Sequence, residues 1–222
     1  MTLRHMQLAI LGHVPLPMPS FAEQTMAMPA LRRHWTTADV RALTREDRPW
    51  PRYELIDGEL LVTPAPRSPH QQAAFELCVI LDAYVTREGL GLAMLSPSDL
   101  ELRPGTITQP DVFVIPAETT IAEDIIQWPD VKSLHLAIEV LSPSSLRTDR
   151  VTKRDFYLDA GVEEYWIVDM EARVIERWTP RQETPHLLRD RLEWAPRGRQ
   201  PLIIDLPVFF SRVDEKLRAF PR

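Results

Sequence analysis

Two acidic residues lie inside segments that have the composition of buried strands. Asp111 starts the apolar run DVFVI, and Glu139 lies inside the nearly continuous apolar run LHLAIEVL. A carboxylate in a buried strand must be paired, protonated or bound to a metal ion. On adjacent strands the two would offer oxygen ligands to a cation such as Mg²⁺, which favours one or two carboxylates, waters and a substrate phosphate. The alternatives are a turn aspartate for Asp111 and a salt bridge to a buried arginine for Glu139.

Lys153 is the basic residue whose position suits the same chemistry. It is one of only three lysines in the chain and follows Glu139 by 14 residues, in a segment that we expect to be helical. If that helix folds back across the end of the strand, the ammonium can orient an attacking water or stabilise developing negative charge. The alternative is a solvated surface lysine that pairs with Asp149, one helical turn earlier.

Two further residues could complete such a site. Glu54 lies beside the expected hairpin turn at Asp57-Gly58 and could act as an outer metal ligand, whereas Asp57 itself suits the turn. His70 lies in the first turn of a long predicted helix, where the positive helix end suits contact with a phosphate. A solvated histidine is the alternative for His70.

The elements that must position these residues follow from hydrophobic periodicity and from turn residues. Thr36 and Thr37 can cap a short helix, and Ser68 followed by Pro69 predicts a long one with Ser68 as its N-cap. Gly161 suits the end of the helix that contains Lys153. The mixture is α+β, a mixed sheet flanked by helices. Strands are expected at 92–95, 99–103, 111–115, 134–141, 164–169, 173–179 and 191–195, and helices at about 148–160 and 211–220.

Length and composition favour one globular domain. The chain has 222 residues and a net charge of −6, so any nucleic-acid contact requires a local basic patch. Cys78 is the only cysteine, which excludes an internal disulfide and a zinc site built from cysteines. No apolar run is long enough to cross a membrane, and a reducing cytoplasm is the simplest setting. Residues 1–30 are expected to be a disordered leader before a single domain at 31–222.

One long segment resembles a known family. The run AIEVLSPSSLRTDRVTKRDFYLDAGVEEYWIVD, at residues 137–169, is similar to the Uma-two family of proposed restriction endonucleases, formerly a domain of unknown function. YELIDGEL, SPHQ and QPDVFVI precede it in the order that the family shows. The resemblance extends roughly from Thr36 to Thr179. The family belongs to the PD-(D/E)XK nuclease superfamily, which implies a mixed sheet flanked by helices and a divalent metal at its centre.

The resemblance assigns roles to particular positions. Asp111 and Glu139 match the superfamily's two strand carboxylates, and Glu54 matches an acidic residue from an upstream element. The superfamily's lysine normally follows the glutamate by two residues, but this chain has Leu141 there. The position that matches in this family is Lys153, and Tyr157 lies one turn later and could assist.

These roles predict an endonuclease that uses Mg²⁺ or Mn²⁺ and cleaves DNA by metal-activated water. Its basic contacts would come from Arg147, Arg150 and Arg154, and it could act as a homodimer because a duplex has two strands. Two alternatives stay open. One is an inactive protein of the same fold that binds nucleic acid or a protein partner, and the other is a metal hydrolase of small phosphate esters.

Overall fold

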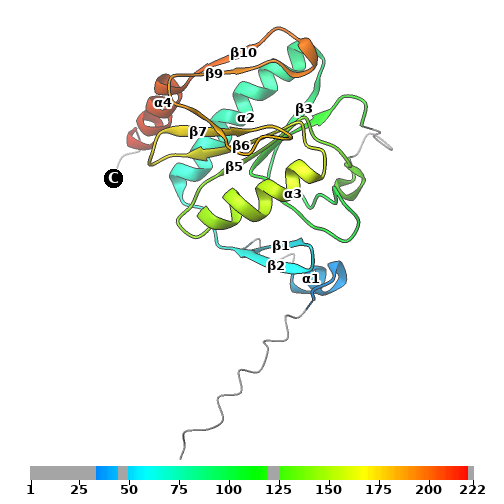
Figure 1. Ribbon diagram of the computed structural model, residues 1–222. Coiled ribbons are helices and arrows are strands. Elements are labelled where there is room, and N and C mark those ends of the chain that lie inside the picture. Colours follow the sequence, from blue (N-terminus) through cyan, green and yellow to red (C-terminus); the bar gives the residue numbers. More distant parts are fainter. Residues whose placement is uncertain (1–33, 45–49, 120–125, 220–222) are drawn as a thin grey trace, which may run out of the picture. The chain divides into compact units, whose positions relative to one another are not determined.

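The computed structural model describes residues 34–44, 50–119 and 126–219, and Figure 1 labels its helices and strands. The leader expected at residues 1–30 lies outside the described residues. The described residues fall in one compact unit, Arg33–Arg222. Within these ranges no helix combines the length and the apolar character that a bilayer span requires.

A mixed sheet forms the centre of this unit, as predicted, and it has six strands in the order β3-β4-β5-β6-β7-β8. β5 and β6 are parallel, because the chain crosses over one face of the sheet between them, and the other neighbouring pairs are antiparallel. Every residue of β4 and β5 is buried, in keeping with their continuous apolar sequences. The strands are β3 Gly91–Leu95, β4 Val112–Pro116, β5 Leu136–Val140, β6 Glu164–Asp169, β7 Val174–Trp178 and β8 His186–Leu188.

One face of the sheet is covered by the long helix α2 (Ser68–Glu88), by α4 (Leu206–Arg218) and by the hairpin of β9 (Arg191–Trp194) and β10 (Leu202–Asp205). Tyr84 of α2 and Trp166 of β6 both pack against Trp194 of β9 in this layer. The apolar residues of α2, at helical spacing, therefore meet the sheet face that also carries Val112 and Ile138.

The opposite face is covered by a helix with two parts, the π-helical turn η2 (Thr148–Lys153) and the α-helix α3 (Arg154–Asp159). Figure 1 shows α3 on the side of the sheet opposite α2. Phe156 and Tyr157 pack there against Phe113, Tyr165 and their neighbours. Gly161 has φ +83° and ends the helix, as the sequence predicts.

A hairpin and a short helix lie at the end of the sheet where the candidate site forms. β1 (Arg52–Ile56) and β2 (Glu59–Thr63) pair through the turn at Asp57-Gly58, and both turn residues have positive φ. Leu55 and Ile107 exchange two backbone hydrogen bonds, which fix β1 to the loop before β4. The helix α1 (Thr37–Leu43) begins with a capping box between Thr36 and Asp39.

Three local predictions are wrong in detail. Ser68 is the first residue of α2 and not its cap, because Arg67 has the extended conformation that precedes the helix. Residues 99–103 form only a bridge between Leu100 and Thr108, since the chain turns away at Arg103. The last helix starts at Leu206 rather than near residue 211, because the Asp205 side chain caps it. A short 3₁₀ turn at Trp128–Asp130 and another at Pro196–Gly198 complete the described elements.

Candidate active site

The register of two strands brings the two suspected carboxylates together. Val112 of β4 pairs with Ile138 of β5 in an antiparallel ladder, so one step further along Asp111 lies opposite Glu139. Residues opposite each other in such a ladder project from the same face of the sheet. That face is the one covered by η2 and α3. The apolar strands therefore deliver two acidic side chains to one place beneath a helix.

Asp111 is buried and accepts hydrogen bonds from two elements. Its Oδ2 lies 2.9 Å from the backbone nitrogen of Val140 and 2.9 Å from Nε2 of His70. Nη1 of Arg52 lies 3.6 Å from its Oδ1. Burial alone raises the pKa of Asp111, but the hydrogen bonds from His70 and Val140 and the charge of Lys153 outweigh burial and lower it. Asp111 is therefore held as a carboxylate.

Lys153 lies among three other buried carboxylates. Its Nζ is 2.7 Å from Oε2 of Glu54, 3.0 Å from Oε1 of Glu139 and 3.9 Å from Oδ1 of Asp149. Burial lowers the pKa of Lys153, but Glu139, Glu54 and Asp149 together raise it well above its usual value. The hydroxyl of Tyr157 donates to Oε1 of Glu139 at 3.2 Å. The ammonium is thus kept charged and is held by Glu54 and Glu139.

The π-helical turn explains how Lys153 reaches that position. Asp149 and Lys153 both lie in this wider turn, and both side chains are buried while Val151 between them is exposed. The Tyr165 hydroxyl donates to the backbone oxygen of Asp149 at 3.0 Å and holds the turn against β6. Such π-helical insertions are frequent at functional sites. A lysine absent from the strand is therefore supplied by the helix above it.

Glu54 lies on the hairpin strand β1, and each of its carboxylate oxygens has a partner. Its Oε1 accepts the backbone N–H of Gln109 at 2.8 Å, and its Oε2 faces Lys153. The side-chain nitrogen of Gln109 donates to Asp99 at 2.5 Å, while its buried Oε1 has no hydrogen-bond partner. In this arrangement Glu54 orients Lys153 directly.

The side chains described above line a cavity of about 30 Å³, which has room for about one or two water-sized species. We call it the carboxylate pocket, and its acidic members are Glu54, Asp111, Glu139 and Asp149. Lys153 and Arg52 are the basic residues that line it besides His70. Because negative groups outnumber positive ones, burial and the neighbouring carboxylates raise the pKa of Glu139 well above its usual value and that of Asp149 to about 6.

The oxygen atoms that line this pocket are suitable ligands for a hard divalent cation. The buried oxygens Oε1 of Gln109 and Oδ1 of Asp149 have no hydrogen-bond partner, and carboxylate oxygens are in excess. No group of three or more His, Cys, Asp or Glu residues is arranged as a ready-made cage within the described part of the chain. Mg²⁺ does not require such a cage, because it commonly takes one or two carboxylates and completes its shell with water and phosphate.

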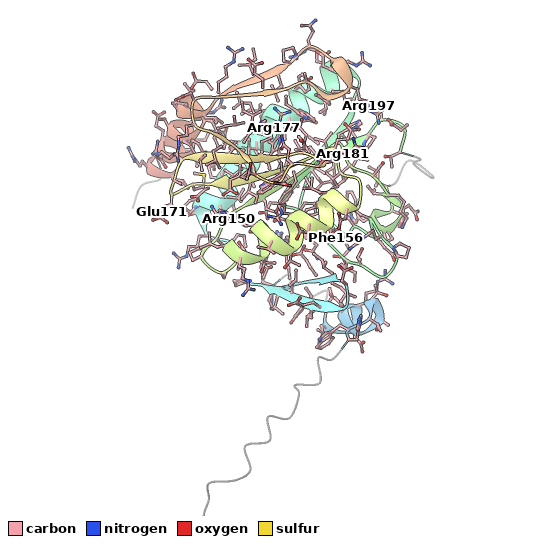
Figure 2. All side chains as sticks on the ribbon, viewed as in Figure 1. Arg150, Phe156, Glu171, Arg177, Arg181 and Arg197 are labelled. Atoms are coloured by element: carbon pink, nitrogen blue, oxygen red, sulfur yellow. The ribbon has the colours of Figure 1, made fainter. Side chains whose placement is uncertain are left out.

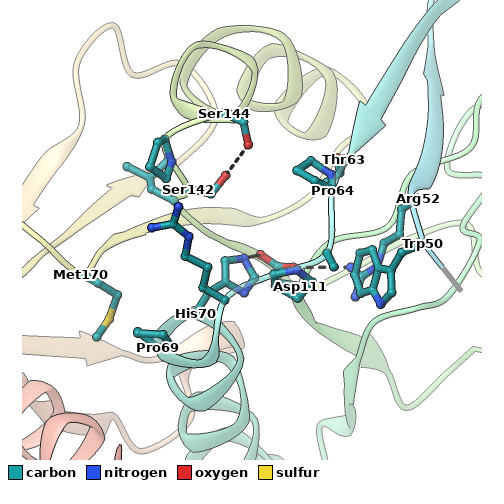
Figure 3. Close-up of a pocket in the computed structure, with 15 residues that line it drawn as sticks. Trp50, Arg52, Thr63, Pro64, Pro69, His70, Asp111, Ser142, Ser144 and Met170 are labelled. Atoms are coloured by element: carbon teal, nitrogen blue, oxygen red, sulfur yellow. Dashed lines mark hydrogen bonds and ion pairs between the residues drawn. The ribbon is translucent and has the colours of Figure 1, made fainter.

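A larger pocket of about 480 Å³ opens directly onto Asp111 and His70. Figure 3 shows Asp111 and His70 at its centre, with Trp50 and Arg52 on one side and Ser142 and Ser144 on another. The guanidinium of Arg52 lies 4.2 Å from the centre of the Trp50 ring. A substrate can therefore approach Asp111 from solvent without displacing Lys153.

The three arginines expected to contact nucleic acid have different surroundings. Arg150 donates to Glu176 and to Asp169, at 2.7 and 3.0 Å, and in Figure 2 it lies at one end of the helix that also carries Phe156. Arg154 pairs with Asp155, and its guanidinium lies 4.8 Å from the centre of the Trp178 ring. Arg147 is exposed, and no ion pair of it is found among the described residues.

Four residues of the site have no role in the sequence analysis. Trp50, Arg52, Gln109 and Asp149 all line the two pockets. In the sequence, Asp149 stands out only as the i, i+4 partner of Lys153, and Gln109 only as the first residue of the segment QPDVFVI, which indicates no role for its side chain. Trp50 lies in a Pro-rich segment typical of a loop. Only tertiary contacts make these residues neighbours of Asp111 and Glu139.

Comparison with known proteins agrees with this fold. The family model Uma2, described as "Putative restriction endonuclease", matches residues 37–201. A crystal structure of a "putative nuclease belonging to DUF820" from Anabaena variabilis is similar, with a TM-score of 0.65 and 22% sequence identity over 81% of this chain and 99% of that chain. No curated protein matches. Since the family model matches well over half of the chain, the chain belongs to the Uma2 family, which is described as putative restriction endonucleases, and the matched range includes every residue of the carboxylate pocket.

Proposed function

We propose that this protein is an endonuclease that hydrolyses phosphodiester bonds in DNA with the help of Mg²⁺ or Mn²⁺. The observation that carries the proposal is the carboxylate pocket. In it Asp111 and Glu139 lie opposite each other on neighbouring strands, with the Lys153 ammonium 3.0 Å from Glu139. Membership of the Uma2 family supports the same chemistry.

Asp111 and Glu139 are the residues that would hold the metal ion, with Glu54 as the outer ligand inferred from the sequence. A divalent metal bound there would activate water and offset negative charge on the scissile phosphate. The unpartnered oxygen of Gln109 lines the same cavity and can accept a hydrogen bond from a water molecule in it. The proposed metal ligands are therefore oxygen atoms that have already lost most of their hydrating water through burial.

The chain's own cation and hydroxyl complete the proposed chemistry. Glu54 and Glu139 hold the Lys153 ammonium in a buried, low-dielectric place, where it can stabilise charge that develops on the phosphate oxygens. The Tyr157 hydroxyl donates to Glu139 and fixes that carboxylate. His70 donates to Asp111 and fixes the other. Each proposed catalytic group is therefore oriented before substrate binds.

The decisive experiment is cleavage of labelled DNA by the purified full-length chain with Mg²⁺, with Mn²⁺ and with EDTA. We expect cleavage with either metal, none with EDTA, and none in Asp111→Asn. The matched control is Asp214→Asn, which removes a carboxylate of α4 outside both pockets. If neither metal supports cleavage of any DNA or RNA, the proposal is wrong.

One observation favours a second candidate, a non-catalytic protein that binds nucleic acid or a protein partner. Lys153 Nζ already lies between Glu54 and Glu139, so a cation of the chain itself occupies part of the pocket. Titration calorimetry distinguishes the two, because the enzyme requires divalent-ion binding that Asp111→Asn abolishes and the binding protein does not. The homodimer and the cytoplasmic location inferred from the sequence stay predictions, and analytical ultracentrifugation tests the first.

A further inference from the structure

The larger pocket beside Asp111 has a lining that phosphate recognition alone does not explain. Its walls are largely apolar, formed by Trp50, Pro64, Pro66, Pro69, Leu141 and Met170. Its polar groups include His70 and Asp111, which it shares with the carboxylate pocket. Figure 3 shows these polar side chains together, with Met170 and Pro69 beside them. The pocket is therefore an apolar chamber joined to the proposed catalytic carboxylates.

The size of the chamber limits what can enter it. At about 480 Å³ it falls within the range of roughly 300–1,000 Å³ typical of sites for small molecules and cofactors. A single nucleotide belongs to that class, whereas a double helix requires a long open groove.

The apolar and aromatic lining of the pocket suits a nucleotide base more closely than it suits the sugar-phosphate backbone of DNA. In a regular duplex the faces of the bases are stacked, and only their edges are accessible in the grooves. An unpaired base instead exposes an apolar face that aromatic side chains can cover. Trp50 supplies an aromatic ring in the wall of the pocket. The guanidinium of Arg52 lies over that ring and is also 3.6 Å from the carboxylate of Asp111, so the aromatic wall and the carboxylate are neighbours.

Polar groups at the opposite side suit the sugar and phosphate of the same nucleotide. The hydroxyls of Ser142 and Ser144 lie 3.0 Å apart at the rim. The N-terminus of α2 begins in the lining with Pro69 and His70, and no side chain caps it. A phosphate bound there would gain from the helix end and lie next to Asp111.

We propose that this pocket takes one unstacked nucleotide of the substrate, so that the protein acts on single-stranded or locally unpaired DNA in preference to a regular duplex. This inference rests on the proposed nuclease function for its catalytic part, but its binding part does not need cleavage. A duplex substrate would have to extrude a nucleotide, and the cost of unstacking is least where the strand is already unpaired.

The first test is binding by the full-length chain in EDTA, so that cleavage cannot contribute. Fluorescence polarisation compares a labelled single-stranded oligonucleotide with its duplex, and the single strand is expected to bind about tenfold more tightly. Trp50→Ala is expected to remove most of that difference, and Trp50→Phe to keep it because an aromatic ring remains. Trp128→Ala is the matched control, since Trp128 is also half-buried but lies outside the pocket.

The second test is cleavage with Mg²⁺ of a duplex that contains a six-nucleotide unpaired loop, where cuts are expected to map to the loop. Equal or tighter binding of the duplex, or an unchanged preference in Trp50→Ala, would overturn the inference. Duplex cleavage without single-strand preference would overturn it while leaving the nuclease proposal intact. A single-strand preference that depends on Trp50, without any cleavage, would support the pocket assignment and count against the nuclease.

Discussion

Two clusters of charged side chains in this protein contain buried carboxylates, and their positive and negative charges are balanced in opposite ways. On the α2 side of the sheet, Glu76 is buried and pairs with Arg212 and Lys216 of α4, and Gln72 donates to it as well. We call this group the helix bridge. Its two cations are about half exposed, so they keep their water while they neutralise one carboxylate. The helix bridge is fully satisfied, as expected of a group that joins two helices.

The carboxylate pocket on the other face has the reverse balance. Its four carboxylates face one buried lysine, with Arg52 and His70 beside Asp111 alone, and oxygens of Gln109 and Asp149 have no hydrogen-bond partner. Burial and mutual repulsion raise the pKa of Glu139, so this charge distribution costs folding free energy. A fold that neutralises Glu76 with two cations does not neutralise Glu139 in the same way. Perturbed pKa values of this kind cluster at functional sites, which makes the carboxylate pocket the candidate and the helix bridge the structural contrast.

Replacing the central carboxylate of each cluster is the strongest way to break this comparison. We expect Glu139→Gln to lower nuclease activity by about a thousandfold, while its amide oxygen still accepts from Lys153 and Tyr157 and stability is kept. We expect Glu76→Gln to keep activity but lose about 1–2 kcal/mol of unfolding free energy, because two cations lose their charged partner. DNA cleavage and urea denaturation measure the two effects. Full activity in Glu139→Gln would remove Glu139 from the site.

Replacing the lysine of each cluster tests the same contrast through stability. Lys153→Met leaves several buried carboxylates without their cation, so unfolding free energy is expected to fall by about 3–5 kcal/mol at neutral pH. Lys216→Met is expected to cost less than about 1 kcal/mol, because Lys216 is half-exposed and Arg212 still pairs with Glu76. Urea titrations of both variants measure the loss of unfolding free energy, and equal losses in the two variants would show that the two clusters do not differ.

Asp149 provides a test by pH. Its folded-state pKa of about 6 exceeds the ordinary value of 3.8, so the folded protein holds this proton more tightly than the unfolded chain does. Its contribution to stability is present below about pH 4 and is lost as pH rises through 6, by about 2–3 kcal/mol. Asp149→Asn should lack this loss. The check is the difference in unfolding free energy between wild type and variant at pH 4 and pH 7, and a difference that does not change with pH would contradict it.

The sequence reveals this contrast only in part. Glu139 can be recognised because an acidic residue interrupts an apolar strand, and the structure indeed buries it in β5. Lys153 can be recognised because lysines are rare in the chain and helical spacing carries it back over that strand. The sheet, the hairpin turn and the end of the helix at Gly161 follow from equally local signals.

The remainder depends on contacts that local pattern does not encode. Gln109 joins the site because two backbone hydrogen bonds between Leu55 and Ile107 draw the hairpin onto the loop before β4. Asp149 turns inward because the helix begins with a π-helical turn, for which the sequence has no clear signature. Ser68 is the first residue of α2 rather than its cap, and the sequence does not distinguish the two because Ser followed by Pro suits both positions.

The smallest expected effects concern Arg147 and Arg150, two of the arginines expected to contact nucleic acid, and would show whether the ion pairs of Arg150 are structural like those of the helix bridge. Arg150 pairs with Asp169 and Glu176, so Arg150→Ala should cost about 1 kcal/mol of stability and change DNA affinity little. Arg147 is exposed without an ion pair among the described residues, so Arg147→Ala should keep stability. If Arg147 contacts a phosphate, the slope of log affinity against log salt concentration should fall by about 1 in that variant. Polarisation titrations over a range of salt concentrations measure this, and a slope that changes only in Arg150→Ala would reverse the two assignments.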